Sequence, residues 1–226
     1  MSKQDQEYDE IIFNKLKGFY NSCMDIDNIN KKGEKPLIDL LNKLKINENK
    51  DKYNDPKELA KMLLKIKLHS LIYYPTPLFR MEVSLNEDMT STVPILLKSN
   101  SFTDDIDKKE LKEVLSNIYK DSNRDIDKMI DSIYDFDKKL FEIKNEENNE
   151  NNKSSPPEIL TVKSLNEKYP NINWKTYLEE IFDLVGLKDK ITDDLLIYNL
   201  SAAYIENLNN ILNEVDGETL SYYFEL

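Results

Sequence analysis

Apolar side chains at three- and four-residue spacing dominate this chain, and only one region changes clearly to a spacing of two. The best-formed stripe consists of Ile126, Met129, Ile133, Phe136, Leu140 and Ile143. This spacing places the whole stripe on one face of an α-helix and predicts a helix with one buried side. Comparable patterns predict further helices at about 8–24, 36–44, 55–71, 107–120, 161–169, 173–186, 201–215 and 218–226.

The exceptional region is 79–97, where apolar and polar side chains alternate. Phe79–Leu85 has this pattern, and 93–97 has it again after a polar turn, which predicts a β-hairpin over about 78–98. Pro94 has no backbone N–H and favours an edge position for the second strand. The short apolar stretch 195–200 predicts a third strand that joins the hairpin, because two strands alone are marginally stable in water. The expected fold class is therefore mainly α (α+β), a multi-helix domain with a small antiparallel sheet.

The charge balance limits the classes of partner. The chain has 43 Asp and Glu against 31 Lys and Arg, which gives a formal net charge of −12. Such a surface disfavours binding to a nucleic-acid backbone, which needs a positive patch. No apolar run reaches the roughly 20 residues of a membrane helix, and the first residues do not resemble a signal peptide. As written, the sequence is expected to be cytoplasmic, with no nucleic-acid partner and no membrane segment.

Scarce residue types limit the chemistry. The four glycines are too far apart to form a phosphate-binding G-x-G-x-x-G loop, and the single histidine, His69, does not supply a two-histidine zinc site. We expect His69 to be a structural residue in the last turn of its helix. The single cysteine, Cys23, leaves no disulfide within the chain. No catalytic and no metal-binding residues are predicted in this chain, and its status as an enzyme is left open.

Residues 145–157 are rich in Asn, Glu, Ser and Pro and contain no apolar material for a core. This composition predicts a disordered loop within an otherwise single domain over residues 1–226. Asn152 and Asn199 stand in N-glycosylation sequons, and only Asn152, in this loop, is expected to be accessible.

Two neighbouring segments resemble a family signature. The first carries Tyr20, Ser22 and Cys23, and the second carries Pro36 and Leu37, in the order aromatic-x-Ser-Cys … Gly-x-x-Pro-Leu. This order is similar to the N-terminal region of the neprilysin / endothelin-converting-enzyme family of zinc metallopeptidases. Downstream segments resemble the same region in the same order, among them Asn173-Trp174-x-x-Tyr177-Leu178, Tyr204-Ile205 and Glu218-Thr219-Leu220. The resemblance covers about residues 7–226.

The resemblance implies the non-catalytic lobe of a zinc metalloendopeptidase, which caps the active-site chamber and restricts hydrolysis to peptides. The family's catalytic motif H-E-x-x-H is absent from this sequence, so zinc is expected only in a catalytic domain that this chain lacks. The chain alone is then expected to be inactive. Its partner would be that catalytic domain, in cis or in trans, and it would meet peptide substrates only in the full-length context.

Seven residues match the family motifs and are expected to have structural roles: Tyr20, Ser22, Cys23, Pro36, Leu37, Trp174 and Tyr204. In the family, the cysteine that matches Cys23 commonly bridges to one far downstream. Cys23 is therefore either half of a disulfide in full-length members or a small buried apolar residue.

Two alternatives remain open. The chain is either part of a peptidase or a free-standing interaction or decoy protein derived from one, and an upstream signal anchor would make it extracellular or membrane-anchored. Under the first alternative, the helix at 218–226 continues into a missing half. Its apolar residues are then expected to be partly exposed: Tyr222, Tyr223, Phe224 and Leu226.

We predict that the purified chain does not bind zinc stoichiometrically, because one histidine and one cysteine do not close a tetrahedral site. Equilibrium dialysis with metal analysis measures this directly. Tight, saturable zinc uptake, or peptide cleavage that a chelator abolishes, would contradict the prediction.

Overall fold

The computed structural model describes residues 3–69, 77–86, 89–103, 106–142 and 156–226. The chain divides into two compact units, unit 1 at residues 1–40 and unit 2 at residues 41–226. The described residues form ten α-helices and four strands, which confirms the expected mainly helical fold with a small sheet. All but two residues of the predicted loop at 145–157 lie outside the described residues.

Unit 1 is helical. It contains α1 (Lys3–Met24), α2 (Ile26–Lys32) and the first residues of α3 (Lys35–Leu44). The Asp25 carboxylate caps α2 by accepting a hydrogen bond from the N–H of Asn28 at 3.1 Å. Gly33 ends the helix with a φ of 51°, in the left-handed region that favours glycine.

Unit 2 is built around a four-stranded sheet with the order β1-β2-β4-β3. The strands are β1 (Phe79–Leu85), β2 (Thr92–Lys98), β3 (Glu158–Thr161) and β4 (Leu196–Asn199). The predicted hairpin and the predicted third strand are both confirmed. The sheet is mixed rather than wholly antiparallel, because β4 pairs with β2 in parallel through Ile95 and Leu96. The fourth strand, β3, was not predicted, because it occupies only four residues ahead of a helix cap.

The edge position expected for the strand that contains Pro94 is wrong, because β2 lies between β1 and β4. The parallel pairing with β4 involves only Ile95 and Leu96, so it ends before Pro94 is reached. Opposite Pro94 on the other side lies Val83 of β1. A short neighbouring strand therefore allows a proline within an interior strand.

The helices of unit 2 are η1 (Asn47–Lys52), α4 (Pro56–His69), α5 (Lys108–Ile118), α6 (Ile126–Phe141), α7 (Val162–Lys168), α8 (Trp174–Asp183), η2 (Lys188–Lys190), α9 (Ala202–Leu212) and α10 (Gly217–Phe224). Six of these helices begin at a side-chain cap, namely α4, α5, α6, α7, α8 and α10. Asp55 accepts from two N–H groups of the first turn of α4, and Thr161 forms a capping box with Ser164. Ser201 precedes α9 but does not cap it, since its hydroxyl accepts from the N–H of Lys98 in β2 at 3.0 Å.

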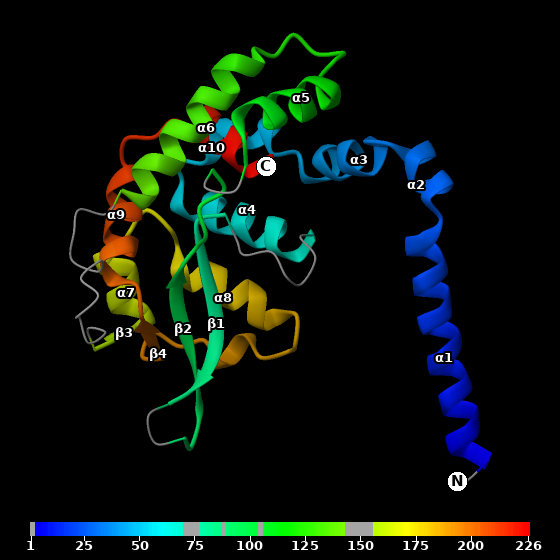
Figure 1. The fold of residues 1–226 in the computed structure, drawn as a ribbon. Helices are drawn as coiled ribbons and strands as arrows, with labels where there is room; N and C mark the ends of the chain where they lie inside the picture. The colour runs from blue at the N-terminus through cyan, green and yellow to red at the C-terminus, as the bar shows by residue number, and fades with distance from the viewer. Residues whose placement is uncertain (1–2, 70–76, 87–88, 104–105, 143–155) are drawn as a thin grey trace, which may run out of the picture. The chain divides into compact units, whose positions relative to one another are not determined.

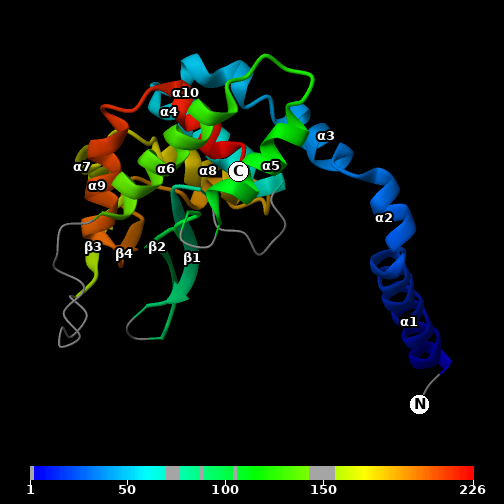
Figure 2. The same ribbon diagram turned by 45° about the horizontal axis from the view of Figure 1, so that its top comes forward.

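Aromatic side chains link the sheet to the helices. The Phe79 ring lies 4.9 Å from the ring of Trp174 and 5.0 Å from that of Tyr177, so α8 packs against the start of β1. Helix α4 packs beside α8, and α6 packs beside both α9 and α10. Figures 1 and 2 show this arrangement, and Figure 1 shows the β1–β2 hairpin extending past the helices that cover its first half.

The exposure expected at the C-terminal helix is wrong for three of its four apolar residues. Tyr222, Tyr223 and Phe224 are buried, and only Leu226 is partly exposed, at 37%. The reason is that α10 packs between η1 and α6. The Phe224 ring meets the Tyr53 ring edge-on at 5.4 Å, so both ends of unit 2 share one core.

The start of α10 approaches the backbone of η1 too closely for a side chain. A Cβ at Gly217 would lie 1.9 Å from the carbonyl oxygen of Lys50. We predict that Gly217→Ala lowers the free energy of unfolding by about 1–3 kcal/mol, as other overpacked substitutions do. Urea unfolding followed by circular dichroism measures the change.

The matched control is Gly18→Ala in α1, where an added Cβ meets nothing within 4 Å. This variant should keep or slightly raise helix stability, since alanine is the better helix former. Equal unfolding curves for Gly217→Ala and the unmodified chain would show that the close approach does not matter.

Candidate functional site

The residues predicted from the family motifs fall into two separate groups. Tyr20, Ser22, Cys23, Pro36 and Leu37 belong to unit 1, and all five are exposed. Cys23 is a free, exposed thiol on α1. Trp174 and Tyr204 are fully buried in unit 2. The motif residues are therefore divided between the two units, five in unit 1 and two in unit 2.

Trp174 and Tyr204 each contact a residue near the start of β1, Phe79 and Leu78 respectively. The Trp174 indole packs on Phe79 and donates from Nε1 to the carbonyl oxygen of Tyr169 at 2.8 Å. The Tyr204 hydroxyl donates to the carbonyl oxygen of Leu78, also at 2.8 Å. Burial raises the pKa of Tyr204, so this hydroxyl keeps its proton and remains a donor. Both residues therefore hold in place the residues at which the chain enters β1.

His69 ends α4, as expected for a structural histidine. Its Nδ1 donates to the carbonyl oxygen of Lys65, one turn earlier, at 2.8 Å. The ring therefore satisfies a carbonyl group at the end of its own helix.

A buried carboxylate forms a polar centre in unit 2. Asp137 of α6 is 1% exposed and accepts hydrogen bonds from Ser101, Phe102, Thr103 and Tyr223, here called the Asp137 cluster. The hydroxyl groups of Ser101, Thr103 and Tyr223 all donate at 2.6 Å. Neutral donors thus replace the water that the carboxylate loses on burial.

The Asp137 cluster joins three parts of the chain rather than lining a cavity. It ties the segment after β2 to α6 and to α10, and the Tyr223 ring packs edge-on against Phe136 and Phe102. Burial, and then the negative charge of Asp137, raise the pKa of Tyr223, so its hydroxyl stays protonated and donates. The centre is built to position helices, because no substrate reaches a carboxylate with this burial.

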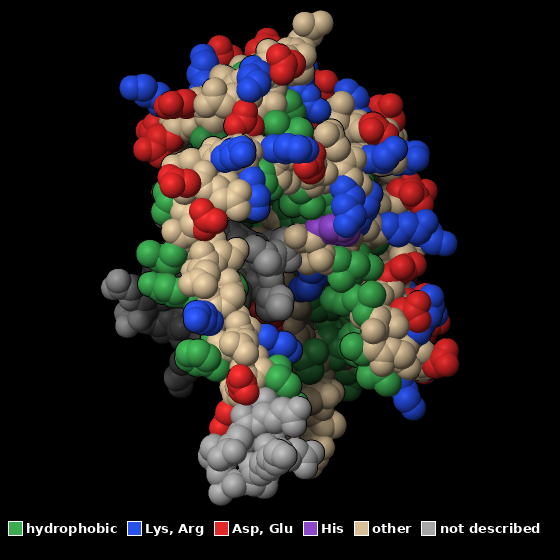
Figure 3. Space-filling model, turned by 90° about the vertical axis from the view of Figure 1, so that its right-hand side faces the viewer, with side chains coloured by type: hydrophobic (Ala, Val, Ile, Leu, Met, Phe, Trp, Pro, Cys, Tyr) green, Lys and Arg blue, Asp and Glu red, His purple; other side chains and the backbone are tan. Residues whose placement is uncertain are grey.

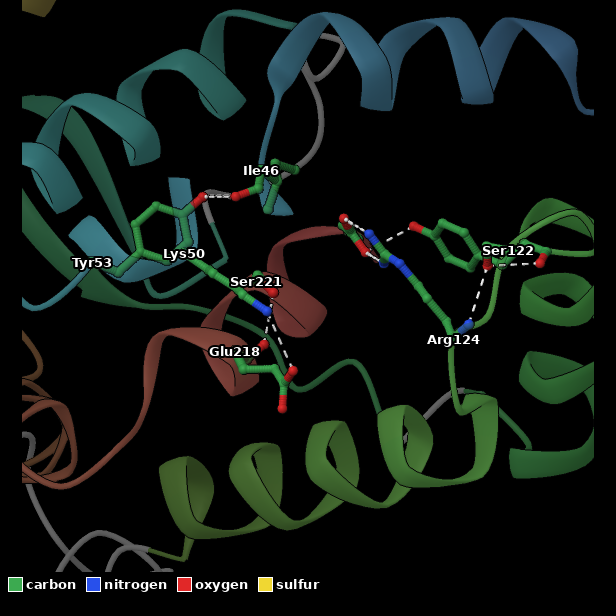
Figure 4. Close-up of polar contacts among 9 residues, drawn as sticks. Ile46, Lys50, Tyr53, Ser122, Arg124, Glu218 and Ser221 are labelled. Atoms are coloured by element: carbon green, nitrogen blue, oxygen red, sulfur yellow. Dashed lines mark hydrogen bonds and ion pairs between the residues drawn. The ribbon is translucent and has the colours of Figure 1, made fainter. Parts of the chain in front are cut away.

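A second polar centre holds the end of α10 (Figure 4). Glu225, which is almost fully buried, accepts hydrogen bonds from Nη1 and Nη2 of Arg124, with Nη2 at 3.2 Å from Oε1. The Tyr119 hydroxyl donates to Glu225 Oε2 at 2.8 Å, and the guanidinium lies 4.3 Å above the Tyr119 ring. We call Tyr119, Arg124 and Glu225 the C-terminal clamp. A paired and hydrogen-bonded charge of this kind is costly to break on one side only.

Glu218, the second residue of α10, bridges two other segments. Its carboxylate accepts from Lys128 of α6 at 2.6 Å and from Lys50 of η1 at 3.4 Å. The hydrogen bond from Lys128 holds the pKa of Glu218 below its ordinary value. All three side chains are partly exposed, so solvent weakens these pairs.

Three surface pockets of unit 2 differ in their suitability for a ligand. One, of about 160 Å³, is lined by lysines that include Lys61 and Lys65, but both already bond to protein oxygens. A polar one, of about 320 Å³, lies between α6, α9 and α10. The third, of about 200 Å³, is almost wholly apolar and lies beside the hairpin. Across the described part of the chain, no three His, Cys, Asp or Glu side chains are placed to hold a metal ion.

None of the helices in the described ranges has the length and apolar character needed to cross a bilayer.

The sequence contained a signal for the Asp137 cluster that was missed. Asp137 stands within the apolar stripe of its helix, four residues after Ile133 and three before Leu140. A carboxylate on a buried face requires donors from elsewhere in the fold. The C-terminal clamp left a weaker signal: Glu225 stands between Phe224 and Leu226, but its partners Tyr119 and Arg124 lie about 100 positions earlier in the chain.

We predict that Asp137→Asn lowers the free energy of unfolding by about 2–4 kcal/mol, the range for breaking a buried, hydrogen-bonded charge network. The asparagine side chain would place an NH₂ group, which donates hydrogen bonds, opposite the hydroxyl and N–H groups that donate to Asp137. Chemical denaturation measures the loss. Asp135→Asn is the control, since Asp135 is exposed on the same helix and should change stability by less than about 0.5 kcal/mol. Equal losses for the two variants would contradict the prediction.

Comparison with known proteins identifies the family of the chain. No curated protein matches it, but the model of the N-terminal domain of peptidase family M13 matches residues 1–226, the whole sequence. The order of motifs read from the sequence agrees with this match. The chain belongs to peptidase family M13, the neprilysin family, and corresponds to its N-terminal domain.

Proposed function

We propose that this chain is the non-catalytic lobe of a neprilysin-like zinc metalloendopeptidase and that it caps the chamber in which peptides are cleaved. The family match over residues 1–226 is the observation that supports this role. In this role the chain forms part of the chamber wall and keeps out substrates larger than peptides. The zinc-bearing catalytic domain carries out the hydrolysis. The zinc ion is expected only in that catalytic domain, so the chain alone would cleave no peptide.

The surface of α1 supports a protein partner. Within unit 1 the apolar side chains of this helix are exposed, among them Tyr8, Ile12, Phe13, Leu16, Phe19 and Tyr20. A run of this length on one helix is more apolar surface than a monomeric protein ordinarily leaves in water. We propose that the catalytic domain, in cis or in trans, covers it.

The test mixes the purified chain with the catalytic domain of a neprilysin-like peptidase and measures complex formation by light scattering. We expect a one-to-one complex, which Leu16→Glu with Phe19→Glu weakens at least tenfold, because two charges enter an apolar contact. Asn14→Glu with Asn21→Glu adds the same charge at exposed polar positions of α1 and should bind as the unmodified chain does.

Activity provides a second measurement. The complex should cleave short peptides better than folded proteins, and the catalytic domain alone should lose this preference. Absence of a complex, or cleavage by the chain alone, would contradict the proposed role.

A free-standing interaction or decoy protein derived from such a peptidase is the second candidate. It is favoured by one observation: the apolar side chains of α10 are buried within unit 2, and the C-terminal clamp holds this helix there, so their burial requires no partner. This candidate predicts that the chain inhibits the catalytic domain of a related peptidase instead of completing it.

A further inference from the structure

The outer edge of β1 is one edge of the four-stranded sheet, and among the described strands β1 pairs only with β2. The neighbouring strand fixes which backbone groups lie there. In β2, the carbonyl oxygen of Leu96 accepts from the N–H of Leu200, so Leu96 faces β4. Backbone groups alternate in direction along a strand, so Ile95 faces β1, where it is paired with Glu82.

The same alternation determines which way the backbone groups of β1 point. Since Glu82 faces β2, the N–H and C=O groups of Met81 and Val83 point away from the sheet. The carbonyl oxygen of Met81 meets the Lys67 ammonium at 3.5 Å, which agrees with this direction. Beyond Met81, no strand in the described ranges pairs with this edge. Val83 and Leu85 therefore offer backbone donors and acceptors to a further strand.

An apolar pocket opens beside this edge. It has a volume of about 200 Å³ and is lined by Val83, Thr92, Pro94, Phe182, Lys190, Ile191 and Leu195. We call the pocket and the adjoining edge of β1 the hairpin groove. Figure 3 looks onto this side of the molecule and shows hydrophobic side chains along a hollow beside the hairpin. The volume suits one large apolar side chain and is below the roughly 300–1,000 Å³ of small-molecule sites.

Among the described residues, the segment from Val83 to Leu85 carries neither a proline nor a charge that would keep the strand from pairing. Val83 and Leu85 are 61% and 55% exposed, although they continue the face that Phe79 and Met81 bury farther along β1. The exposed stretch has no proline and no bulge, and its charged residues, Arg80 and Glu82, point to the other face and pair with each other. An open, apolar edge of this kind is a template for strand addition.

The charge at the groove indicates the chemistry of the occupant. Lys190 lines the pocket and makes no ion pair with any residue in the described ranges. Its neighbour Lys188, in contrast, lies 3.8 Å from the carboxylate of Asp183. An ammonium that lines an apolar pocket favours a ligand with a carboxylate next to an apolar side chain.

We propose that the hairpin groove binds an extended peptide that adds to the sheet as a strand beside β1. One large apolar side chain of the peptide enters the pocket, and an adjacent Asp or Glu pairs with Lys190. Backbone hydrogen bonds to Val83 and Leu85 supply affinity, and the pocket selects the side chain. This inference goes beyond the proposed function, because it concerns binding by the chain itself and does not require a catalytic domain.

The experiment uses the full chain and a fluorescent decapeptide of alternating Thr and Val with one central Leu flanked by Asp. We expect saturable binding by fluorescence anisotropy that Val83→Lys weakens at least tenfold. Ser84→Lys, on the opposite face of the same strand, is the matched control and should bind normally. Lys190→Ala should weaken binding severalfold, and Lys188→Ala should not.

A second probe separates strand addition from binding in the pocket alone. Methylating alternate backbone nitrogens of the peptide removes the donors that face β1, and we expect binding to fall at least tenfold. Circular dichroism verifies that each variant is folded. The proposal is overturned by absent binding, by equal binding of Val83→Lys and the unmodified chain, or by equal affinity of the methylated peptide. It is also overturned if the edge pairs with a second copy, which appears as a dimer that Val83→Lys disrupts and the peptide does not displace.

Discussion

The burial of one carboxylate organises unit 2. Asp137 lies in the middle of α6, and its donors come from the segment after β2 and from the last helix, 86 residues farther along the chain. A charged group in this position is stable only while all of its donors are in place. The sheet, α6 and α10 are thereby coupled, and the packing of Phe136 on Tyr223 follows from the same arrangement. The C-terminal clamp and the contact of Gly217 with η1 then fix α10 at its two ends.

The hairpin shows how one strand serves two purposes. Its first half is part of the core, where Phe79 packs on Trp174 and Leu78 bonds to Tyr204. Its second half keeps the same alternation but leaves the cover of α8, so Val83 and Leu85 reach the surface. A strand that was only structural would end at the edge of its core or carry charges beyond it. This exposed second half of β1 forms one side of the hairpin groove.

Local patterns predicted most of the elements, and long-range contacts decided the rest. The stripe through Ile133 and the alternation in Phe79–Leu85 were sufficient for the helix and the hairpin, because each depends on neighbours in sequence. The mixed sheet was not predictable, since the parallel pairing of β4 with β2 joins segments about 100 residues apart. The burial of Tyr223 depends equally on a distant carboxylate. Asp137 could have been found from the sequence, because it is a charged residue within the apolar stripe of its helix.

The burial of Trp174 also decides how this protein can be observed. It is the only tryptophan in the chain, it lies in unit 2, and it is 1% exposed. Its fluorescence therefore reports whether the core around β1 is intact. An unfolding curve from tryptophan emission follows this core of unit 2, and a second reporter placed in α1 would follow unit 1 separately.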